Sequence, residues 1–352
     1  MSENKECCCG PAAKKDIKYR LSPGPVGTKW SLSDHLGEIK VRLGFDRMNY
    51  AVAPGIYSVG KPGRQSPVLV SANYKLSFDV LRRELEGLDV WILVLDTKGV
   101  NVWCAAGKGT FGSMEIVRRV TETGLEKLVD TRQLIVPQLG APGISAHMVQ
   151  AFCGFSVVYG PVRASDIKKF LAQGMEADPQ MRRVYFNLCD RLTVSWLELA
   201  HAFEPAVLVT LLLVFFAVLR MKIFVLNRTS AELSMLPFLF WGAVVSGTVL
   251  HAVLLPYLPG RAFSFKGGVL GAVVCAAMIY LFGQPLTLAT WIALVLMAGG
   301  VSAFLALNFT GASTFTSLSG VKKEIRYSMP LIIGAISIGA LIEIADIVRR
   351  FL

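Results

Sequence analysis

The second half of this 352-residue sequence has very few charged residues. From Pro205 to the C-terminus it holds only 10 Lys and Arg and 4 Asp and Glu, against 26 and 21 up to Glu204. Long apolar runs fill the second half, and each is near the length needed to cross about 30 Å of hydrocarbon. The scarcity of charge excludes a wholly soluble protein. It predicts five membrane spans, at about 205–226, 235–255, 267–283, 286–308 and 329–348.

Other features are missing as well. No basic stripe interleaves with aromatic residues, which excludes a nucleic-acid surface, so the net charge of +11 fits solvation and contact with membrane lipid. Residues 1–20 lack the apolar core of a secretory signal, and the seven cysteines show no paired framework, as is typical of a reducing cytoplasm. We expect a multi-pass protein of the cytoplasmic (inner) membrane with its soluble domain in the cytoplasm. The basic residues, five on each side, do not decide the orientation.

Composition and periodicity divide the chain into three regions. Residues 1–30 are expected to be a flexible leader, and its CCC triplet at 7–9 is either a soft-metal site or a run of exposed thiols. Residues 31–190 alternate strands with helices, which predicts an α/β, Rossmann-like domain with a mostly parallel sheet. Residues 191–352 are expected to form a linker helix and an all-α transmembrane domain of five helices. Residues 67–70 form a short apolar run, strands are expected at 89–96 and 155–162, and residues 134–145 are expected to be a strand that breaks into a Pro/Gly loop. The expected helices are 76–87, 113–124, 164–174 with Ser165 as N-cap, and 181–203, which leads into the membrane.

Three ionisable residues and one small-residue pattern stand out within the expected spans. His251 lies at membrane depth, where a role in a pathway and a hydrogen bond between helices are equal alternatives. Glu343 and Asp346 lie near the two arginines at the C-terminal end, which favours an ion pair at a helix end. Gly267 and Gly271 form a GxxxG pattern that favours helix packing over chemistry.

The stretch NVWCAAGKGTFG, residues 101–112, carries the densest set of candidate functional residues. A phosphate-binding loop of the form GxxxxGK[ST] needs glycine at position 102 and a hydroxyl residue at position 109. The sequence has Val102 and Gly109, which excludes this loop.

A dinucleotide-binding turn remains open for the same stretch. Gly107, Gly109 and Gly112 spell GxGxxG, between a possible strand VNVWCA and a possible helix SMEIVRRV. Asp130 would be the acidic residue about 20 positions further on.

A third interpretation makes Cys104 a metal ligand. In a helix it would share a face with Asn101 and Lys108. One cysteine cannot supply the four ligands of a zinc site, but it suits an axial position on a macrocycle that already fills four positions. The alternative is a small buried hydrophobe, which is the usual role of a lone cysteine.

The segment NVWCAAGK resembles the signature of the mercury-methylating corrinoid proteins, the HgcA family, whose architecture of a corrinoid-binding domain and five spans also matches. Residues 134–171 are similar to the cobamide-binding end of the corrinoid iron-sulfur protein of the acetyl-CoA pathway. The resemblance implies a cap helix under a corrin ring, with the Cys104 thiolate as lower axial ligand of the cobalt. It therefore favours a helix over a strand around Cys104, and His147 is expected to be structural. The implied cofactor-binding residues are Asn101, Val102, Trp103, Cys104, Ala105, Ala106, Gly107, Lys108, Gly109, Gly140 and Gly143.

The same resemblance implies a methyltransferase that uses a corrinoid (cobalamin or a related cobamide) to move a methyl group from cobalt to Hg(II), making methylmercury. Hg(II) is an electrophile, so it needs a methyl group that carries its bonding electrons, or a radical. A donating sulfur opposite the methyl group favours that transfer. The implied partners are a ferredoxin-like protein with two [4Fe-4S] clusters, a methyl donor of the methyltetrahydrofolate pathway, Hg(II) and membrane lipid. The alternatives are a membrane corrinoid protein with another methyl acceptor, a nicotinamide-dependent oxidoreductase using Gly107, Gly109 and Gly112, and a metal sensor or carrier using the cysteine triplet.

Overall fold

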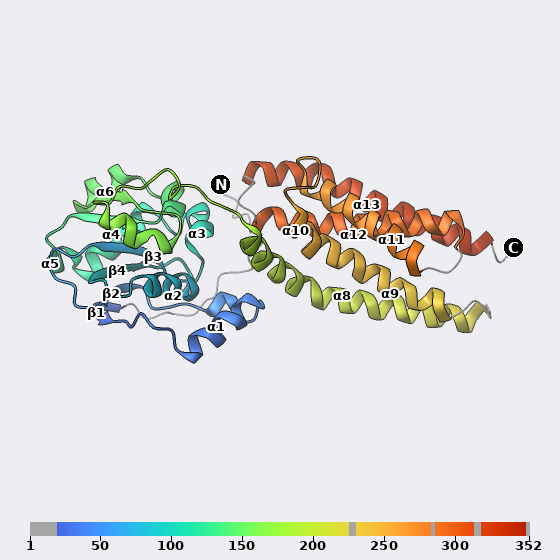
Figure 1. Cartoon of the computed structure of the whole chain (residues 1–352), viewed down its shortest axis with the longest axis horizontal. Helices are drawn as coiled ribbons and strands as arrows, with labels where there is room; N and C mark the ends of the chain where they lie inside the picture. The colour runs from blue at the N-terminus through green and yellow to red at the C-terminus, as the bar shows by residue number, and fades with distance from the viewer. Residues whose placement is uncertain (1–19, 225–229, 283–285, 313–317, 350–352) are drawn as a thin grey trace, which may run out of the picture. The chain divides into compact units, whose positions relative to one another are not determined.

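Figure 1 shows the computed structural model of the chain, which describes residues 20–224, 230–282, 286–312 and 318–349. The chain divides into two compact units, Met1–Tyr185 and Phe186–Leu352. The first unit is α/β and the second is helical, which confirms the predicted fold class. The cysteine triplet lies outside the described residues.

A six-stranded sheet in the order β1-β2-β4-β3-β5-β6 forms the centre of the first unit. The four strands β3 to β6 are mutually parallel, which confirms the parallel arrangement predicted for them. β2 is antiparallel to β4, and β1 is parallel to β2, so the complete sheet is mixed. The strands are β1 (Arg20–Pro25), β2 (Gly55–Val59), β3 (Val68–Ala72), β4 (Val90–Leu95), β5 (Gln133–Val136) and β6 (Ser156–Tyr159).

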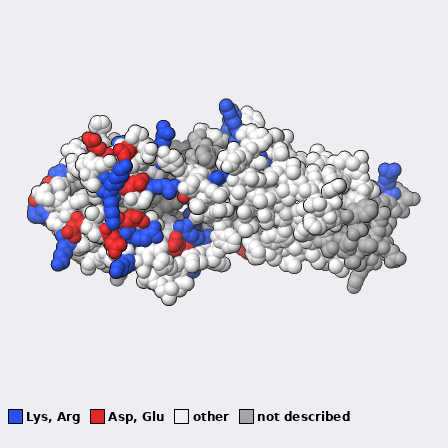
Figure 2. Space-filling model, in the orientation of Figure 1, with Lys and Arg blue, Asp and Glu red and all other residues white. Residues whose placement is uncertain are grey.

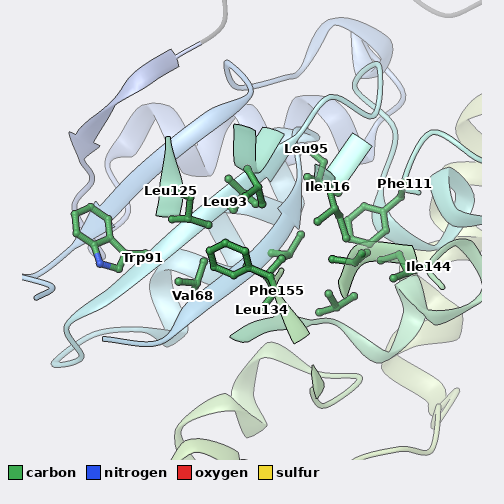
Figure 3. Packing of buried hydrophobic residues seen from close by; sticks show 14 of the residues in the cluster. Val68, Trp91, Leu93, Leu95, Phe111, Ile116, Leu125, Leu134, Ile144 and Phe155 are labelled. Carbon is green, nitrogen blue, oxygen red and sulfur yellow. The ribbon is translucent and has the colours of Figure 1, made fainter. Parts of the chain in front are cut away.

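Helices cover both faces of the sheet. One face packs against α3, α4, α5 and α6, and the other against α2 and α7. In Figure 3 the first of these cores extends from Trp91, near the start of β4, to Phe111 and Ile144 at the opposite end. The helices of this unit are α1 (Leu32–Arg42), α2 (Lys75–Glu84), α3 (Val102–Lys108), α4 (Ser113–Thr123), α5 (Leu125–Leu128), α6 (Ala146–Cys153) and α7 (Ile167–Ala172), with 3₁₀ turns η1 (Arg47–Asn49), η2 (Gln138–Gly143) and η3 (Ala164–Asp166).

Several elements differ from the sequence prediction. Residues 20–25 were expected in the flexible leader but form β1. Its sequence, RLSPGP, contains two prolines and a glycine, which are residues typical of loops and not of strands. Proline is tolerated there because β1 is an edge strand. Ser165 is not an N-cap, because it lies inside η3. The strand β2 and the helices α1, α5 and α6 were not predicted.

Among the described residues of the second unit, five helical stretches are long and apolar enough to span a membrane, as predicted. They are Leu188–Val218, Met235–Leu254, Phe263–Phe282, Leu288–Gly311 and Ser319–Asp346. Figure 2 shows the contrast in charge: many blue and red side chains lie on the visible face of the α/β unit, whereas the described residues on the visible face of the helical unit are mostly white. The expected linker helix and first span form one helix. The elements are α8 (Leu188–Phe224), α9 (Ser230–Val245), the π-helical segment η4 (Ser246–Leu250), α10 (His251–Leu254), α11 (Phe263–Phe282), α12 (Leu288–Ala312) and α13 (Leu318–Arg349).

The GxxxG pattern serves helix packing, as predicted. A side chain at Gly267 would lie 2.2 Å from the Cβ of Ala306, and one at Gly271 would lie 2.3 Å from the Cβ of Ser302. The Ser302 hydroxyl donates a hydrogen bond to the Gly267 carbonyl at 2.7 Å. The absence of side chains thus lets the backbones of α11 and α12 approach closely.

The ionisable residues of the spans have different surroundings. His251 is fully buried beside the rings of Phe263 and Phe309, and neither ring nitrogen has a hydrogen-bond partner within the described part of the chain. A hydrogen bond between helices therefore does not explain this histidine. Asp346 accepts hydrogen bonds from the Thr287 and Thr290 hydroxyls. Its ion pair with the C-terminal arginines stays a prediction, since residue 350 lies outside the described residues.

Candidate functional site

The loops that follow the parallel strands meet at the carboxyl edge of the sheet. Asn73 follows β3, residues 96–101 connect β4 to α3, and η2 follows β5. Ligands of such sheets bind at this edge, because the connections open there between strand and helix. The residues predicted to bind a cofactor lie in the second and third of these connections, in α3, or, for Gly109, at the C-cap of α3.

Asn73 holds the connection between β4 and α3 in place. Its side-chain oxygen accepts hydrogen bonds from the Thr97 amide (3.1 Å), the Thr97 hydroxyl (2.8 Å) and the Gly99 amide (3.0 Å). Both Asn73 and Thr97 are fully buried. Lys98 and Gly99 adopt positive φ angles of 58° and 72°, and the three bonds to Asn73 stabilise this tight turn before α3.

The short helix α3 is defined by a cap at each end. The Asn101 side chain accepts a hydrogen bond from the Cys104 amide at 2.9 Å, as an N-cap residue does. Gly109 ends the helix at φ 79°, a left-handed conformation that favours glycine. The structure confirms the helix expected around Cys104 and rules out the strand that a dinucleotide-binding turn would need.

α3 has a buried face and an open face. Ala105 and Ala106 are buried in the core between α3 and the sheet. Cys104 is half-buried on the opposite side of the helix. Gly107 is exposed on that side, and a Cβ added there would meet no atom within 4 Å. Lys108, exposed, follows Cys104 by one helical turn.

The 3₁₀ turn η2 packs tightly against α3 and the residues after it. A Cβ on Gly143 would lie 2.2 Å from the carbonyl oxygen of Phe111 and 3.1 Å from the Cα of Ala106. A Cβ on Gly140 would lie 2.4 Å from the Phe111 ring. Phe111 itself is fully buried beside Ile144, as Figure 3 shows. The predicted residues Gly140 and Gly143 are thus brought next to α3, where the protein's own backbone and the Phe111 ring fill the space beside them.

The residues of the dinucleotide-binding alternative are not brought together. Gly107 lies within α3 and Gly112 is the N-cap of α4, so no single turn contains the glycines. Asp130 precedes β5 at the amino edge and forms an ion pair with Arg64 at 2.6 Å. His147 is exposed on α6. The structure does not support a nicotinamide site here.

Sequence reasoning missed two residues that build the site, Asn73 and Phe111. Asn73 is a polar residue directly after an apolar strand, a position that often faces a ligand or a neighbouring turn, and this signal was available. Nothing local marks Phe111 as the residue on which η2 packs. Its role depends on the approach of η2, about 30 residues further along the chain.

Comparison with known proteins finds relatives of the α/β unit. Residues 45–171 match a family described as the CO dehydrogenase/acetyl-CoA synthase delta subunit. The acetyl-CoA decarbonylase/synthase complex subunit gamma of Methanopyrus kandleri is 33% identical over 122 residues, which are 34% of this chain and 26% of that protein. The corrinoid/iron-sulfur protein large subunit of Moorella thermoacetica is 28% identical over 114 residues, 32% of this chain and 25% of that protein.

Residues 45–171 therefore form a domain related to these subunits. The chain matches only about a quarter of the length of these two relatives. The matched family segment contains α3, η2 and every predicted site residue, and it ends before the helical unit.

Replacing Asn73 with alanine is expected to loosen the turn before α3. The change leaves the Thr97 and Gly99 amides without an acceptor, and each such buried donor costs about 1–3 kcal/mol. Amide hydrogen exchange of residues 97–104 in the full chain should accelerate by at least about 30-fold, which corresponds to 2 kcal/mol. Asn49→Ala, at an exposed asparagine, is the control and should leave this exchange unchanged. Unchanged exchange in Asn73→Ala would show that Asn73 does not hold the turn.

Proposed function

We propose that the α/β unit binds a corrinoid on the open face of α3, with the Cys104 thiolate as axial ligand of the cobalt. We further propose that the chain transfers a methyl group to Hg(II). One observation carries the proposal: Cys104 faces away from the core of the sheet, on a helix side where Gly107 leaves open space. A flat macrocycle needs a surface of this kind, free of projecting side chains next to the ligand atom.

The residues around Cys104 fit a ligand that must be held rigidly. The Asn101 cap fixes the first turn of α3, and the burial of Ala105 and Ala106 fixes the helix against the sheet. Gly143 of η2 packs against the backbone of Ala106 and so supports the second turn of α3. The thiol is therefore presented from a supported helix, which is what a metal ligand of defined geometry requires.

A bound corrinoid would supply the cobalt–carbon bond from which the methyl group leaves, and the axial sulfur would tune that bond. The protein contributes the sulfur, its orientation and a surface that the macrocycle covers. Reduction of the cofactor requires an electron donor, for which a ferredoxin-like protein with two [4Fe-4S] clusters is the proposed partner. A donor of the methyltetrahydrofolate pathway is the proposed methyl source.

The proposed location follows from the five spans. We place the chain in the cytoplasmic membrane with the α/β unit on the cytoplasmic side, where reduced thiols and reduced cofactors are available. A corrinoid protein with a different methyl acceptor remains the second candidate. It would share the cofactor and the axial sulfur but would not convert Hg(II).

The visible spectrum of the full chain tests the cofactor and its ligand. Protein purified in detergent under anaerobic conditions is reconstituted with methylcobalamin, alongside Cys104→Ala and Cys153→Ala. Cys153 is the matched control, because it is also half-buried but lies at the end of α6, by the amino edge of the sheet. A cobalt–thiolate spectrum is expected in the parent and in Cys153→Ala, and not in Cys104→Ala. Identical spectra in all three proteins would refute Cys104 as the ligand, and no uptake by any would refute corrinoid binding.

A further inference from the structure

The helix α1 turns an apolar stripe away from the α/β unit. Leu32, Leu36 and Ile39 recur at intervals of four and three residues, so they lie on one side of the helix. These residues are 76%, 58% and 55% exposed, although apolar side chains gain free energy from burial. The stripe is about 10 Å long, since an α-helix rises about 1.5 Å per residue. It is an ordered apolar surface that the described part of the chain leaves open.

Polar contacts on the opposite side of α1 hold this stripe outward. The Asp34 carboxylate accepts hydrogen bonds from Lys75 Nζ at 2.7 Å and from the Arg82 guanidinium at 2.8 Å, and both partners belong to α2. A Cβ on Gly37 would overlap the Tyr50 ring, so the second turn of the helix is packed closely as well. Rolling α1 to bury its leucines would break these contacts, and the open stripe is therefore built into the fold.

The open side of α1 carries no negative charge. All residues of the helix are described, and the exposed ones are Leu32, Ser33, His35, Leu36, Ile39 and Lys40. Of its two acidic residues, Asp34 binds α2, and Glu38 pairs with Arg42 at 2.7 Å. Asp46, which follows the helix, pairs with Lys40 at 3.3 Å. The stripe can thus approach the anionic headgroups of a membrane without repulsion, and the long Lys40 side chain can reach them.

The helical unit begins level with the end of one of its spans. Arg191 of α8 is buried and donates hydrogen bonds to the carbonyl oxygens of Ala252 and Val253, at 3.1 and 2.9 Å. These two residues belong to the last turn of the span Met235–Leu254. Five residues separate Arg191 from Tyr185, the last residue of the α/β unit. This stretch of chain reaches at most about 20–22 Å. The link therefore keeps the α/β unit close to the membrane surface at which this span ends.

We propose that α1 is a membrane-surface helix, whose stripe of Leu32, Leu36 and Ile39 inserts at the boundary between lipid headgroups and acyl chains. Helices of this kind lie in the plane of the membrane with their apolar side about 5–10 Å deep. A protein partner fits the stripe less well, because the binding energy of protein interfaces is concentrated in Trp, Tyr and Arg, and leucine is under-represented there. The inference rests on the five spans and is independent of the proposed cofactor and of Hg(II).

Photo-cross-linking of the full chain in lipid vesicles tests this contact. p-Benzoylphenylalanine replaces Leu36 in one protein and Phe152 in another, and both are reconstituted in phosphatidylcholine vesicles that contain phosphatidylglycerol. Phe152 is the matched control, because it is 63% exposed on α6, and α6 and α2 cover opposite faces of the sheet. After irradiation, lipid adducts per chain are measured by mass spectrometry and should be at least about 10-fold more frequent at position 36. Equal frequencies at the two positions would overturn the proposal.

Removing the stripe around the probe gives a second test. Leu32→Gln with Ile39→Gln, in the chain with the probe at position 36, should lower the lipid adducts at least about 5-fold. Glutamine is a good helix former, and the contacts of α1 with α2 are left in place. Met114→Gln with Met148→Gln, at exposed apolar residues of α4 and α6, is the control and should leave the adducts unchanged. Undiminished adducts in the first variant would overturn the proposal, as would cross-links from position 36 to peptides of this chain or of a second copy in place of lipid.

Discussion

Cys104→Ala should lower the rate of methylmercury formation by at least about 100-fold, a loss of about 2.7 kcal/mol of transition-state stabilisation. The loss is expected to be chemical. Alanine is a better helix former than cysteine, and the amide of residue 104 would still bond to Asn101. The open face of α3 would remain but would present a methyl group in place of a sulfur ligand.

The assay uses the full chain with the reduced iron–sulfur partner, a methyl donor and Hg(II). Cys153→Ala serves as the matched control and should keep the activity of the parent protein. Circular dichroism of the Cys104→Ala protein should match that of the parent. Methylmercury formation by Cys104→Ala at the parental rate would exclude the axial thiolate from the mechanism.

Gly143→Ala should disrupt the site through packing. The added Cβ would lie 2.2 Å from the Phe111 carbonyl oxygen and 3.1 Å from the Cα of Ala106, and both atoms belong to backbone. Neither can rotate away, so η2 and α3 must separate. Overpacking of this kind costs typically about 1–3 kcal/mol, and this backbone contact should be at the upper end. The midpoint temperature of thermal unfolding of the α/β unit should fall by several degrees, and the variant should lose corrinoid uptake.

The same substitution at Gly107, which lies within α3, should do the opposite. Gly107 is helical, exposed and surrounded by open space, so Gly107→Ala gains helix propensity of about 0.5–1 kcal/mol. A higher unfolding temperature for Gly107→Ala and a lower one for Gly143→Ala are therefore expected in parallel scans. If Gly143→Ala were as stable as the parent protein, the close packing of η2 on α3 would not be needed.

The parts of the fold with strong local patterns could be predicted. β4 is apolar at every position because both of its faces are buried, and the spans are recognisable from their length alone. β1 could not be predicted, because a strand with two prolines depends on pairing with its neighbour β2, which local sequence does not reveal. The continuity of α8 through Pro205 also escaped prediction, since proline usually interrupts a helix.

The candidate site was only partly predictable for a related reason. The helix around Cys104 followed from a family resemblance, whereas local sequence left strand and helix open. Gly140 and Gly143 were expected to approach a cofactor, but the structure gives both a packing partner in Phe111. Contacts between segments 30 residues apart leave no local pattern in a single sequence.

Because α3 is short, its cysteine ligand cannot be transferred to another protein together with this segment alone. A helix of seven residues does not persist by itself in water, so the segment NVWCAAGK has its shape only because Asn73, η2 and the sheet impose it. A synthetic peptide with this sequence should be unstructured and a poor cobalt ligand. Engineering a sulfur ligand into a corrinoid protein would accordingly require the supporting turn and a glycine at the position of Gly143, in addition to the cysteine.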